Sequence, residues 1–189
     1  MKEKKKPAVF LDRDGVLTVE RKRIALPQEV ELYPFVKEAI DCLKKAGYLT
    51  IVVTNQSGVA RGLYKEEELV LLHERIKKQT GIDEVYYCPH HPEGVVKKYK
   101  KVCDCRKPAL GMIRKAQEEY LIDMKNSWMI GDRTSDVMLG KAAGLQTILV
   151  KTGYGEIVSM ETEADYVENN LVDAVRTIEK MGRRYEYRE

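Results

Sequence analysis

Residues 9–16 read Val9-Phe10-Leu11-Asp12-Arg13-Asp14-Gly15-Val16, a short apolar run that ends abruptly in two carboxylates and a glycine. The run predicts a buried strand that delivers acids to its own C-terminal end. In an open parallel sheet, ligands sit beyond the carboxyl ends of the strands, so Asp12 and Asp14 are placed where chemistry is expected. Side chains two residues apart on an extended chain point the same way, so the pair can act on one target as nucleophile and proton donor. The alternative is an acidic turn after a strand, because Asp-Gly pairs are common in turns.

Length and composition predict an ordinary enzyme-sized domain. A chain of 189 residues is long enough to bury a core and is expected to form one domain, 1–189, working as a monomer. The net charge of +3 implies neither a nucleic-acid nor a membrane partner. No apolar segment approaches the ~20 residues that cross a bilayer, and the N-terminus lacks the apolar core of a signal peptide. We therefore expect a cytoplasmic protein.

The remaining apolar patterns alternate between the two kinds of element. Further strands are predicted at 49–53, 85–87, 128–130, 146–150 and 166–167. Helices are predicted from 34 to about 46, at 65–79, at 109–120, through Met138, Leu139 and Ala142 until Gly144, and from a cap at Asn170 to 181. This order predicts an α/β, three-layer Rossmann-like fold with a mostly parallel sheet and right-handed crossovers.

Polar side chains follow several of these strands. Thr54-Asn55-Gln56-Ser57-Gly58 offers a hydroxyl, two amides and a flexible backbone, which suits phosphate oxygens, although the same residues also make a good loop. Lys107 precedes Pro108, and because proline suits the first turn of a helix, we expect Lys107 at a helix N-terminus facing a phosphate. A structural ion pair of Lys107 with a carboxylate is the alternative.

Three of the four cysteines cluster with histidines in one region. Twelve residues separate His90 from Cys103. Cys88 with His90, and Cys103 with Cys105, form two ligand pairs on a loop that can close around a tetrahedral ion, and Cys3His is a structural zinc set. His91 could substitute for His90, but His90 gives the same one-residue spacing as the second pair. In a reducing compartment such clustering favours metal over a disulfide.

The polar strand ends combine into one predicted site. Its members are Asp12 and Asp14, Thr54 and Asn55, Lys107, and Asp132 with Asp136. Hard carboxylate oxygens with an open position suit Mg²⁺, which binds through few protein groups and substrate phosphate. Acids, a metal, a hydroxyl and a lysine together predict phosphoryl transfer by a covalent aspartyl route.

These residues resemble, in order along the chain, the four motifs of the haloacid dehalogenase superfamily: 12–15, Thr54, Lys107 and 131–136. By that resemblance Asp12 attacks phosphorus, and Asp14 protonates the leaving oxygen and then activates water. Magnesium would sit on Asp12, the backbone carbonyl of Asp14, and Asp132. Thr54 and Lys107 would hold the transferring phosphoryl group.

Longer segments, at 52–62, 86–92 and 103–108, resemble the D,D-heptose 1,7-bisphosphate 7-phosphatases. That family has no cap domain, and its zinc loop, here 88–107, helps shape the substrate pocket. The resemblance implies that Arg106 meets the second phosphate of the sugar. The histidinol-phosphate phosphatases share the zinc ligands but have a shorter loop, so the twelve-residue gap favours the heptose branch. Lys22-Arg23-Ile24 departs from the family pattern, which leaves the sugar open.

The function implied is hydrolysis of the 7-phosphate of D-glycero-D-manno-heptose 1,7-bisphosphate, with Mg²⁺ and Zn²⁺ bound. Substrate contacts are expected from Thr54, Asn55, Gln56, Ser57, Arg106, Lys107 and Arg133. One alternative is a phosphatase of the same build acting on histidinol phosphate or another small ester. The other is a non-catalytic, zinc-stabilised binding module, which a magnesium-dependent hydrolysis assay would exclude.

Overall fold

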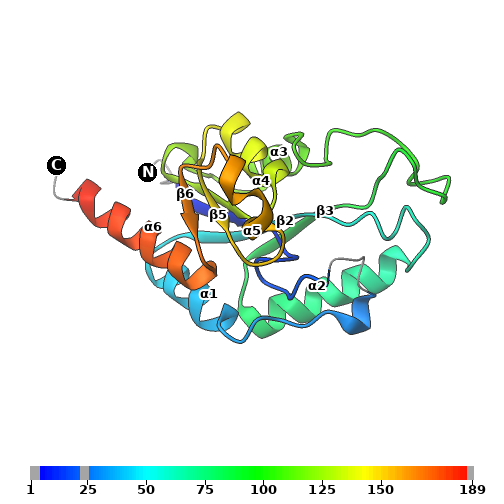
Figure 1. The fold of residues 1–189 in the computed structure, drawn as a ribbon, viewed down its shortest axis with the longest axis horizontal. Helices are drawn as coiled ribbons and strands as arrows, with labels where there is room; N and C mark the ends of the chain where they lie inside the picture. Colours follow the sequence, from blue (N-terminus) through cyan, green and yellow to red (C-terminus); the bar gives the residue numbers. More distant parts are fainter. Residues whose placement is uncertain (1–4, 22–25, 187–189) are drawn as a thin grey trace.

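The structure, a computed structural model, describes residues 5–21 and 26–186 (Figure 1). Its centre is a six-stranded sheet in the order β3-β2-β1-β4-β5-β6, in which every neighbouring pair is parallel. The strands are β1 (Ala8–Leu11), β2 (Leu49–Asn55), β3 (Glu84–Cys88), β4 (Trp128–Gly131), β5 (Gln146–Val150) and β6 (Tyr166–Glu168). The predicted α/β fold is confirmed. The Lys22-Arg23-Ile24 segment lies outside the described residues.

Helices cover both faces of the sheet. They are α1 (Val36–Lys45), α2 (Glu66–Thr80), α3 (Gly111–Glu119), α4 (Thr134–Ala142), α5 (Gly155–Val158) and α6 (Leu171–Glu186), with short 3-10 turns η1 (Pro27–Glu29), η2 (Met124–Asn126) and η3 (Ser159–Glu161). In Figure 1, α1, α2 and α6 lie below the sheet, and α3 and α4 lie above it. This three-layer arrangement follows from strands that are apolar on both sides.

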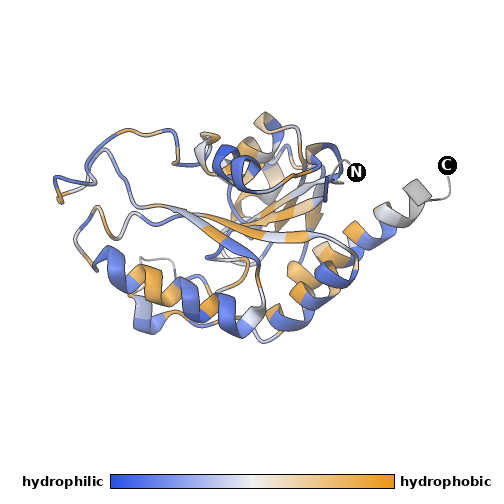
Figure 2. Ribbon diagram, turned by 180° about the vertical axis from the view of Figure 1, so that it is seen from behind, coloured by the Kyte–Doolittle hydropathy of each residue, from blue (hydrophilic) through white to orange (hydrophobic). Residues whose placement is uncertain are grey.

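The burial of β1 shows why the strand is continuously apolar. Val9 and Leu11 pack into the core shared with α1, α2 and α6, whereas Ala8 and Phe10 pack into the core shared with α3. A strand buried on both faces needs no polar alternation. Figure 2 shows the same layering, with hydrophobic residues along the sheet and hydrophilic residues on the outer faces of the helices.

The predicted helices are present, but α1 and α3 each begin two residues later than predicted, and α6 ends at Glu186 and not at 181. At the start of α6, Asn170 Oδ1 accepts the backbone N–H groups of Val172 at 2.9 Å and Asp173 at 3.2 Å, as its predicted capping role requires. The predicted helix over 109–120 is wrong at its start, because α3 begins at Gly111. Pro108 lies in a turn before the helix, and the Lys107-Pro108 peptide is cis. Lys107 therefore does not stand at a helix N-terminus.

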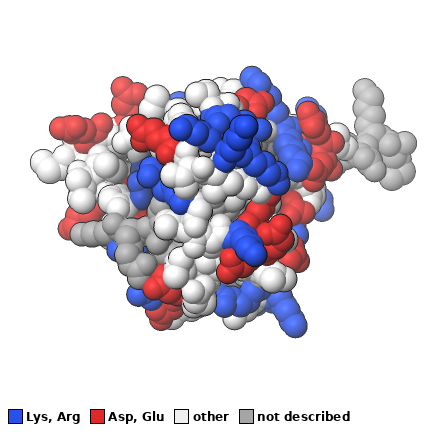
Figure 3. All heavy atoms as spheres, turned by 90° about the vertical axis from the view of Figure 1, so that its right-hand side faces the viewer, with Lys and Arg blue, Asp and Glu red and all other residues white. Residues whose placement is uncertain are grey.

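The carboxyl ends of the strands lie along one edge of the sheet, since all pairings are parallel. Beyond β3 the chain leaves the sheet in a long loop that extends to the right in Figure 1, and it returns before α3. Within the described ranges the chain forms one sheet, and this insertion is a loop and not a cap domain. Lys, Arg, Asp and Glu are interspersed on the face seen in Figure 3. No helix in the described residues is long and apolar enough to cross a membrane.

Candidate active site

A cavity of about 440 Å³ opens at the carboxyl edge of the sheet. Nine of the residues predicted for catalysis or substrate binding line it: Asp12, Asp14, Thr54, Asn55, Gln56, Ser57, Arg106, Lys107 and Arg133. Asp132 is fully buried beside them. The polar residues that follow separate strands therefore come together in one cavity, as expected.

Asp12 and Lys107 line the cavity and are both buried. Lys107 Nζ lies 2.9 Å from Asp12 Oδ1 and 2.7 Å from Asp136 Oδ1, and it donates to the carbonyl of Val53 at 2.8 Å. Burial alone would lower the pKa of Lys107, but the charges of Asp12 and Asp136 outweigh it and raise that pKa. The ammonium is thus charged, pairs with carboxylates, and faces the same cavity as Asp12.

Asp14 reaches the cavity by a different geometry from the one predicted. The strand ends at Leu11, and the chain then turns, with Gly15 at φ +83°. Asp14 accepts hydrogen bonds from Arg13, Thr18 and Gln56 at 2.8–2.9 Å. Burial would raise the pKa of Asp14, but the Arg13 charge and these bonds hold it below its usual value.

Two amides predicted to bind substrate are engaged within the protein. Gln56 Nε2 donates to Asp14 at 2.8 Å and to Thr54 Oγ1 at 3.0 Å, while its Oε1 accepts from Tyr64 at 3.0 Å. Asn55 brackets the backbone of Lys107, donating to its carbonyl at 3.2 Å and accepting its N–H at 3.0 Å. Both side chains thereby fix the groups that line the cavity.

A second group of carboxylates can hold a cation. Asp12, Asp132 and Asp136 each present an oxygen within 4.8 Å of the others. Asp132 Oδ1 is buried without a hydrogen-bond partner in the described chain, while Asp132 Oδ2 accepts the Tyr154 N–H at 2.8 Å. Burial and the nearby charge of Asp12 raise the pKa of Asp132. Three neighbouring carboxylates, one of them with an unsatisfied buried oxygen, fit a hard divalent cation such as Mg²⁺.

Two of the predicted magnesium ligands, Asp12 and Asp132, belong to this carboxylate group. Asp14 was predicted to contact the ion through its backbone carbonyl, and its carboxylate is held by Arg13 at both oxygens. This leaves the backbone carbonyl as the way in which Asp14 would contact the ion. Asp136 joins the group in its place, although one of its oxygens is already paired with Lys107.

Gly15 is required by the close approach of the acidic loop to Asp132. A Cβ added at Gly15 would lie 2.3 Å from Asp132 Oδ2, and the residue has φ +83°. We expect Gly15→Ala to displace Asp132 and reduce activity by about tenfold or more, with a stability loss of roughly 1–3 kcal/mol from backbone strain. Gly47→Ala, also at positive φ but with open space around its Cβ, is the matched control. Equal activity losses in the two variants would contradict this account.

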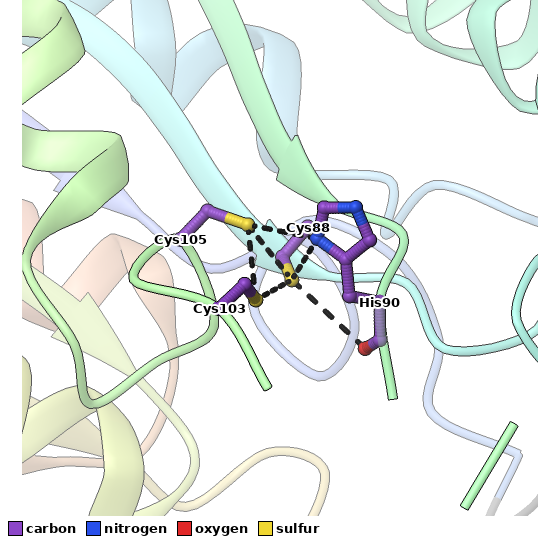
Figure 4. Close-up of side chains that lie close together, drawn as sticks. All are labelled: Cys88, His90, Cys103 and Cys105. Atoms are coloured by element: carbon purple, nitrogen blue, oxygen red, sulfur yellow. Dashed lines mark hydrogen bonds between the residues drawn. The ribbon is translucent and has the colours of Figure 1, made fainter. Parts of the chain in front are cut away.

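The loop after β3 brings four metal-ligand side chains together (Figure 4). The Sγ atoms of Cys88, Cys103 and Cys105 lie 3.2–3.5 Å apart, and His90 Nδ1 lies 3.2 Å from Cys105 Sγ. A tetrahedral zinc ion, with Zn–S bonds of about 2.3 Å, would place its ligands about 3.5–3.8 Å apart. The four donors can close around such an ion with small movements, and the thiols are free.

His90, and not His91, faces the thiols. His91 instead lies with Nε2 3.3 Å from Arg61 Nη2, and its Nδ1 accepts the Glu93 N–H at 3.1 Å. Burial and the charge of Lys101 lower the pKa of His90, so its imidazole is neutral and can donate a lone pair to a metal. The donor set therefore fits structural zinc.

The arginines of the cavity differ in whether a carboxylate neutralises them. Arg133 pairs with Glu20 at 3.3 Å and lies over the Tyr154 ring at 3.9 Å, and Arg21 pairs with Glu31 at 3.5 Å. Among the described residues no ion pair to a carboxylate is formed by Arg106, whose Nη1 donates to the His90 carbonyl at 3.3 Å, or by Arg61. We call Arg61, His91 and Arg106 the arginine cluster.

Several cavity residues were not among the predicted contacts, notably Arg61, His91 and Tyr154. Arg61 follows the polar end of β2, and Tyr154 follows the end of β5. Because ligands bind beyond the carboxyl ends of parallel strands, the loop after the fifth strand was a predictable lining segment. Arg61 was harder to predict as a lining residue, because its only indication was a cationic side chain between the loop glycines Gly58 and Gly62.

Comparisons with known proteins agree with this geometry. A family model described as HAD-hydrolase-like matches residues 104–174. The D-glycero-beta-D-manno-heptose-1,7-bisphosphate 7-phosphatase of Salmonella typhi is 40% identical over 183 residues, covering 92% of this chain and 96% of that protein. The enzyme of the same name from Escherichia coli K12 is also 40% identical, with 92% and 94% covered.

Two solved structures are similar as well. The D,D-heptose 1,7-bisphosphate phosphatase from B. bronchiseptica, complexed with magnesium and phosphate, is 30% identical with a TM-score of 0.80, covering 93% of this chain and 99% of that one. The Burkholderia thailandensis enzyme of that name is 27% identical with a TM-score of 0.65, covering 91% and 97%. Both relatives share the fold and are phosphatases by name.

Proposed function

The chain belongs to the D-glycero-beta-D-manno-heptose-1,7-bisphosphate 7-phosphatase family of haloacid dehalogenase-like phosphatases, and from that premise we propose that it hydrolyses the 7-phosphate of this heptose bisphosphate. The observation that carries the proposal is the single cavity in which Asp12, Asp14 and Lys107 meet a cluster of unpaired arginines. The names of the relatives specify the beta configuration, so the beta anomer is the first substrate to test.

The reaction would proceed in two displacements. A carboxylate oxygen of Asp12 forms a bond to phosphorus as the bond from phosphorus to the sugar O7 breaks. The negative charge of the bound substrate favours the protonated form of Asp14, which gives its proton to that leaving oxygen. Water then attacks the phosphorus of phospho-Asp12, Asp14 takes a proton from the water, and inorganic phosphate leaves. In the structure, Arg13, Thr18 and Gln56 orient the Asp14 carboxylate through hydrogen bonds of 2.8–2.9 Å.

Charge at the reacting phosphoryl group is balanced by cations on two sides. Lys107, held by Asp136 and the Val53 carbonyl, would face it from the lining of the cavity. A bound Mg²⁺ held by Asp12, Asp132 and the Asp14 carbonyl would supply electrostatic stabilisation of the phosphoryl oxygens. Thr54, whose Oγ1 accepts from Gln56, can still donate its own proton to a phosphoryl oxygen.

The second phosphate would bind at the arginine cluster. A planar guanidinium binds phosphate bidentately, and the cluster's arginines carry no competing ion pair within the described part of the chain. Arg133 and Ser57, which also line the cavity, would contact the sugar. The Zn²⁺ loop, residues 88–107, contributes Arg106 and so would set the distance between the two phosphate sites.

Arg106→Ala should narrow the preference for the bisphosphate over heptose 7-phosphate by about 1.5–3 kcal/mol, the range of a hydrogen bond to a charged group. The loss should appear in kcat/KM measured on both substrates. Lys100→Ala removes one charge from an exposed position of the same loop and should leave the preference unchanged. If Arg106→Ala penalises both substrates equally, or histidinol phosphate is the better substrate, the alternative phosphatase takes the place of this proposal.

We also propose that residues 1–189 act as one monomeric, cytoplasmic domain without nucleic-acid or membrane partners. The residues of one chain line the cavity, charges of both signs are interspersed on the face seen in Figure 3, and the three clustered thiols need a reducing compartment to remain free for metal. Sedimentation of the zinc-loaded protein should give the mass of one chain. A dimer that persists at assay concentrations would contradict the monomer.

A further inference from the structure

His73 lies behind the wall of the cavity, on α2. It is 4% exposed, and its Nε2 lies 3.2 Å from Arg13 Nη1. Its Nδ1 is buried and has no hydrogen-bond partner among the described residues. The apolar stripe of α2 gives no reason for a histidine at this position. The contact with Arg13 is the one polar interaction of the His73 side chain among the described residues.

The direction of this hydrogen bond is fixed by chemistry. A guanidinium can only donate, so His73 Nε2 accepts and the single proton of the imidazole sits on Nδ1. Burial, and then the positive charge of Arg13, lower the pKa of His73 to about 3. His73 is therefore a neutral acceptor at neutral pH, and it does not exchange protons during turnover.

The opposite edge of the same guanidinium holds Asp14. Arg13 Nε donates to Asp14 Oδ1 at 2.9 Å and Arg13 Nη2 donates to Asp14 Oδ2 at 2.8 Å, and the arginine is only 3% exposed. A planar fork bound at two edges cannot rotate without breaking bonds on both. The orientation of the carboxylate is thus tied to the position of an imidazole on a different element.

We propose that His73 is a positioning residue, which holds the Arg13 guanidinium and through it keeps the Asp14 carboxylate aligned with the leaving oxygen. The inference rests on the proposed role of Asp14 as proton donor. Asp14 alone passes its proton to the leaving oxygen as the P–O bond breaks. His73 contributes only the geometry of that transfer.

The competing interpretation is that His73 fills space against the Tyr87 ring, whose centroid lies 5.2 Å away. Two variants separate the interpretations. His73→Gln keeps an acceptor near the position of Nε2 but loses the ring, and His73→Phe keeps a ring but loses the acceptor. Ile76→Ala, one turn further along α2 and also buried, matches the expected loss of stability without touching Arg13.

The decisive readout is the dependence on the leaving group. A poor leaving group, the sugar alkoxide, needs the proton from Asp14, whereas nitrophenolate leaves largely without it. For His73→Phe we expect kcat/KM on the sugar phosphate to fall by about tenfold or more, and on p-nitrophenyl phosphate by less than about threefold. His73→Gln and Ile76→Ala should behave like the unmodified protein on both substrates. Equal losses on both substrates, or none on either, would overturn the inference.

Asp14→Asn distinguishes failure of this inference from failure of the proposed function. If Asp14→Asn hydrolyses the sugar phosphate at the unmodified rate, the proposed role of Asp14 is wrong. If Asp14→Asn loses activity with a strong leaving-group dependence while His73→Phe behaves like the unmodified protein, only the role of His73 is wrong.

Discussion

Asp12→Asn should reduce turnover by at least about 10³-fold, because an amide cannot attack phosphorus. The protein should stay folded, because asparagine has nearly the same size as aspartate. The structure explains why the fold should tolerate the change. Lys107 would lose one carboxylate partner but keep Asp136 at 2.7 Å and the Val53 carbonyl at 2.8 Å. Phosphate release and circular dichroism, measured on the same preparation, check both halves of this expectation.

Asp14→Asn is the control for this experiment. It should also be nearly inactive, but it keeps the nucleophile, so a fraction of the protein should carry a phosphoryl group on Asp12 after mixing with substrate. Mass spectrometry of the peptide that contains Asp12 detects that adduct. Appreciable activity of Asp12→Asn in a folded preparation free of the unmodified enzyme would refute the assignment of the nucleophile.

Cys103→Ser should lower both stability and activity by weakening the zinc site. The purified protein should hold about one tightly bound zinc ion, whereas Mg²⁺ should be lost on dialysis and needed only for turnover. We expect the variant to lose zinc and its melting temperature to fall by about 10 °C, since each kcal/mol lowers the midpoint of such a domain by roughly 2–4 °C. Elemental analysis and calorimetry measure the two effects.

Activity should fall with the zinc because the return leg of the loop carries Arg106 and Lys107 into the cavity. Part of the loop has other attachments, since Tyr99 binds Glu66, and Val95 and Val96 donate to the Ala60 carbonyl. The disorder should therefore concentrate around the ligands themselves. Cys42→Ser, a thiol on α1 away from the cluster, should change neither zinc content nor activity. Zinc-free protein prepared without chelators, yet stable and active, would contradict the loop assignment.

The sequence was most informative where the chain alternates between apolar strands and polar strand ends. The run 9–14 predicted both that β1 is buried and that Asp12 lies at the functional edge of the sheet, because the carboxyl ends of parallel strands lie along one edge. Metal spacing was equally direct, since Cys88, His90, Cys103 and Cys105 do meet in the structure. Both patterns lie within short segments of the chain, so they could be recognised without knowledge of the tertiary structure.

Contacts between distant segments could not be predicted in the same way. One partner of Asp14 is its own neighbour Arg13, which contacts a histidine sixty residues away in the chain. Gln56 and Asn55 bind protein groups instead of facing a ligand with free amides. The start of α3 was misplaced because a proline suits a helix N-terminus and a turn alike. Only tertiary structure chooses between such uses of one residue type.

The account is tested most directly by following D-glycero-beta-D-manno-heptose 1,7-bisphosphate by phosphorus NMR after addition of the zinc-loaded protein and Mg²⁺. We predict that the 7-phosphate signal disappears, inorganic phosphate appears in equal amount, and the sugar keeps its 1-phosphate. Asp12→Asn should leave both signals unchanged. Release of the 1-phosphate, or no release under conditions where histidinol phosphate is hydrolysed, would contradict the account.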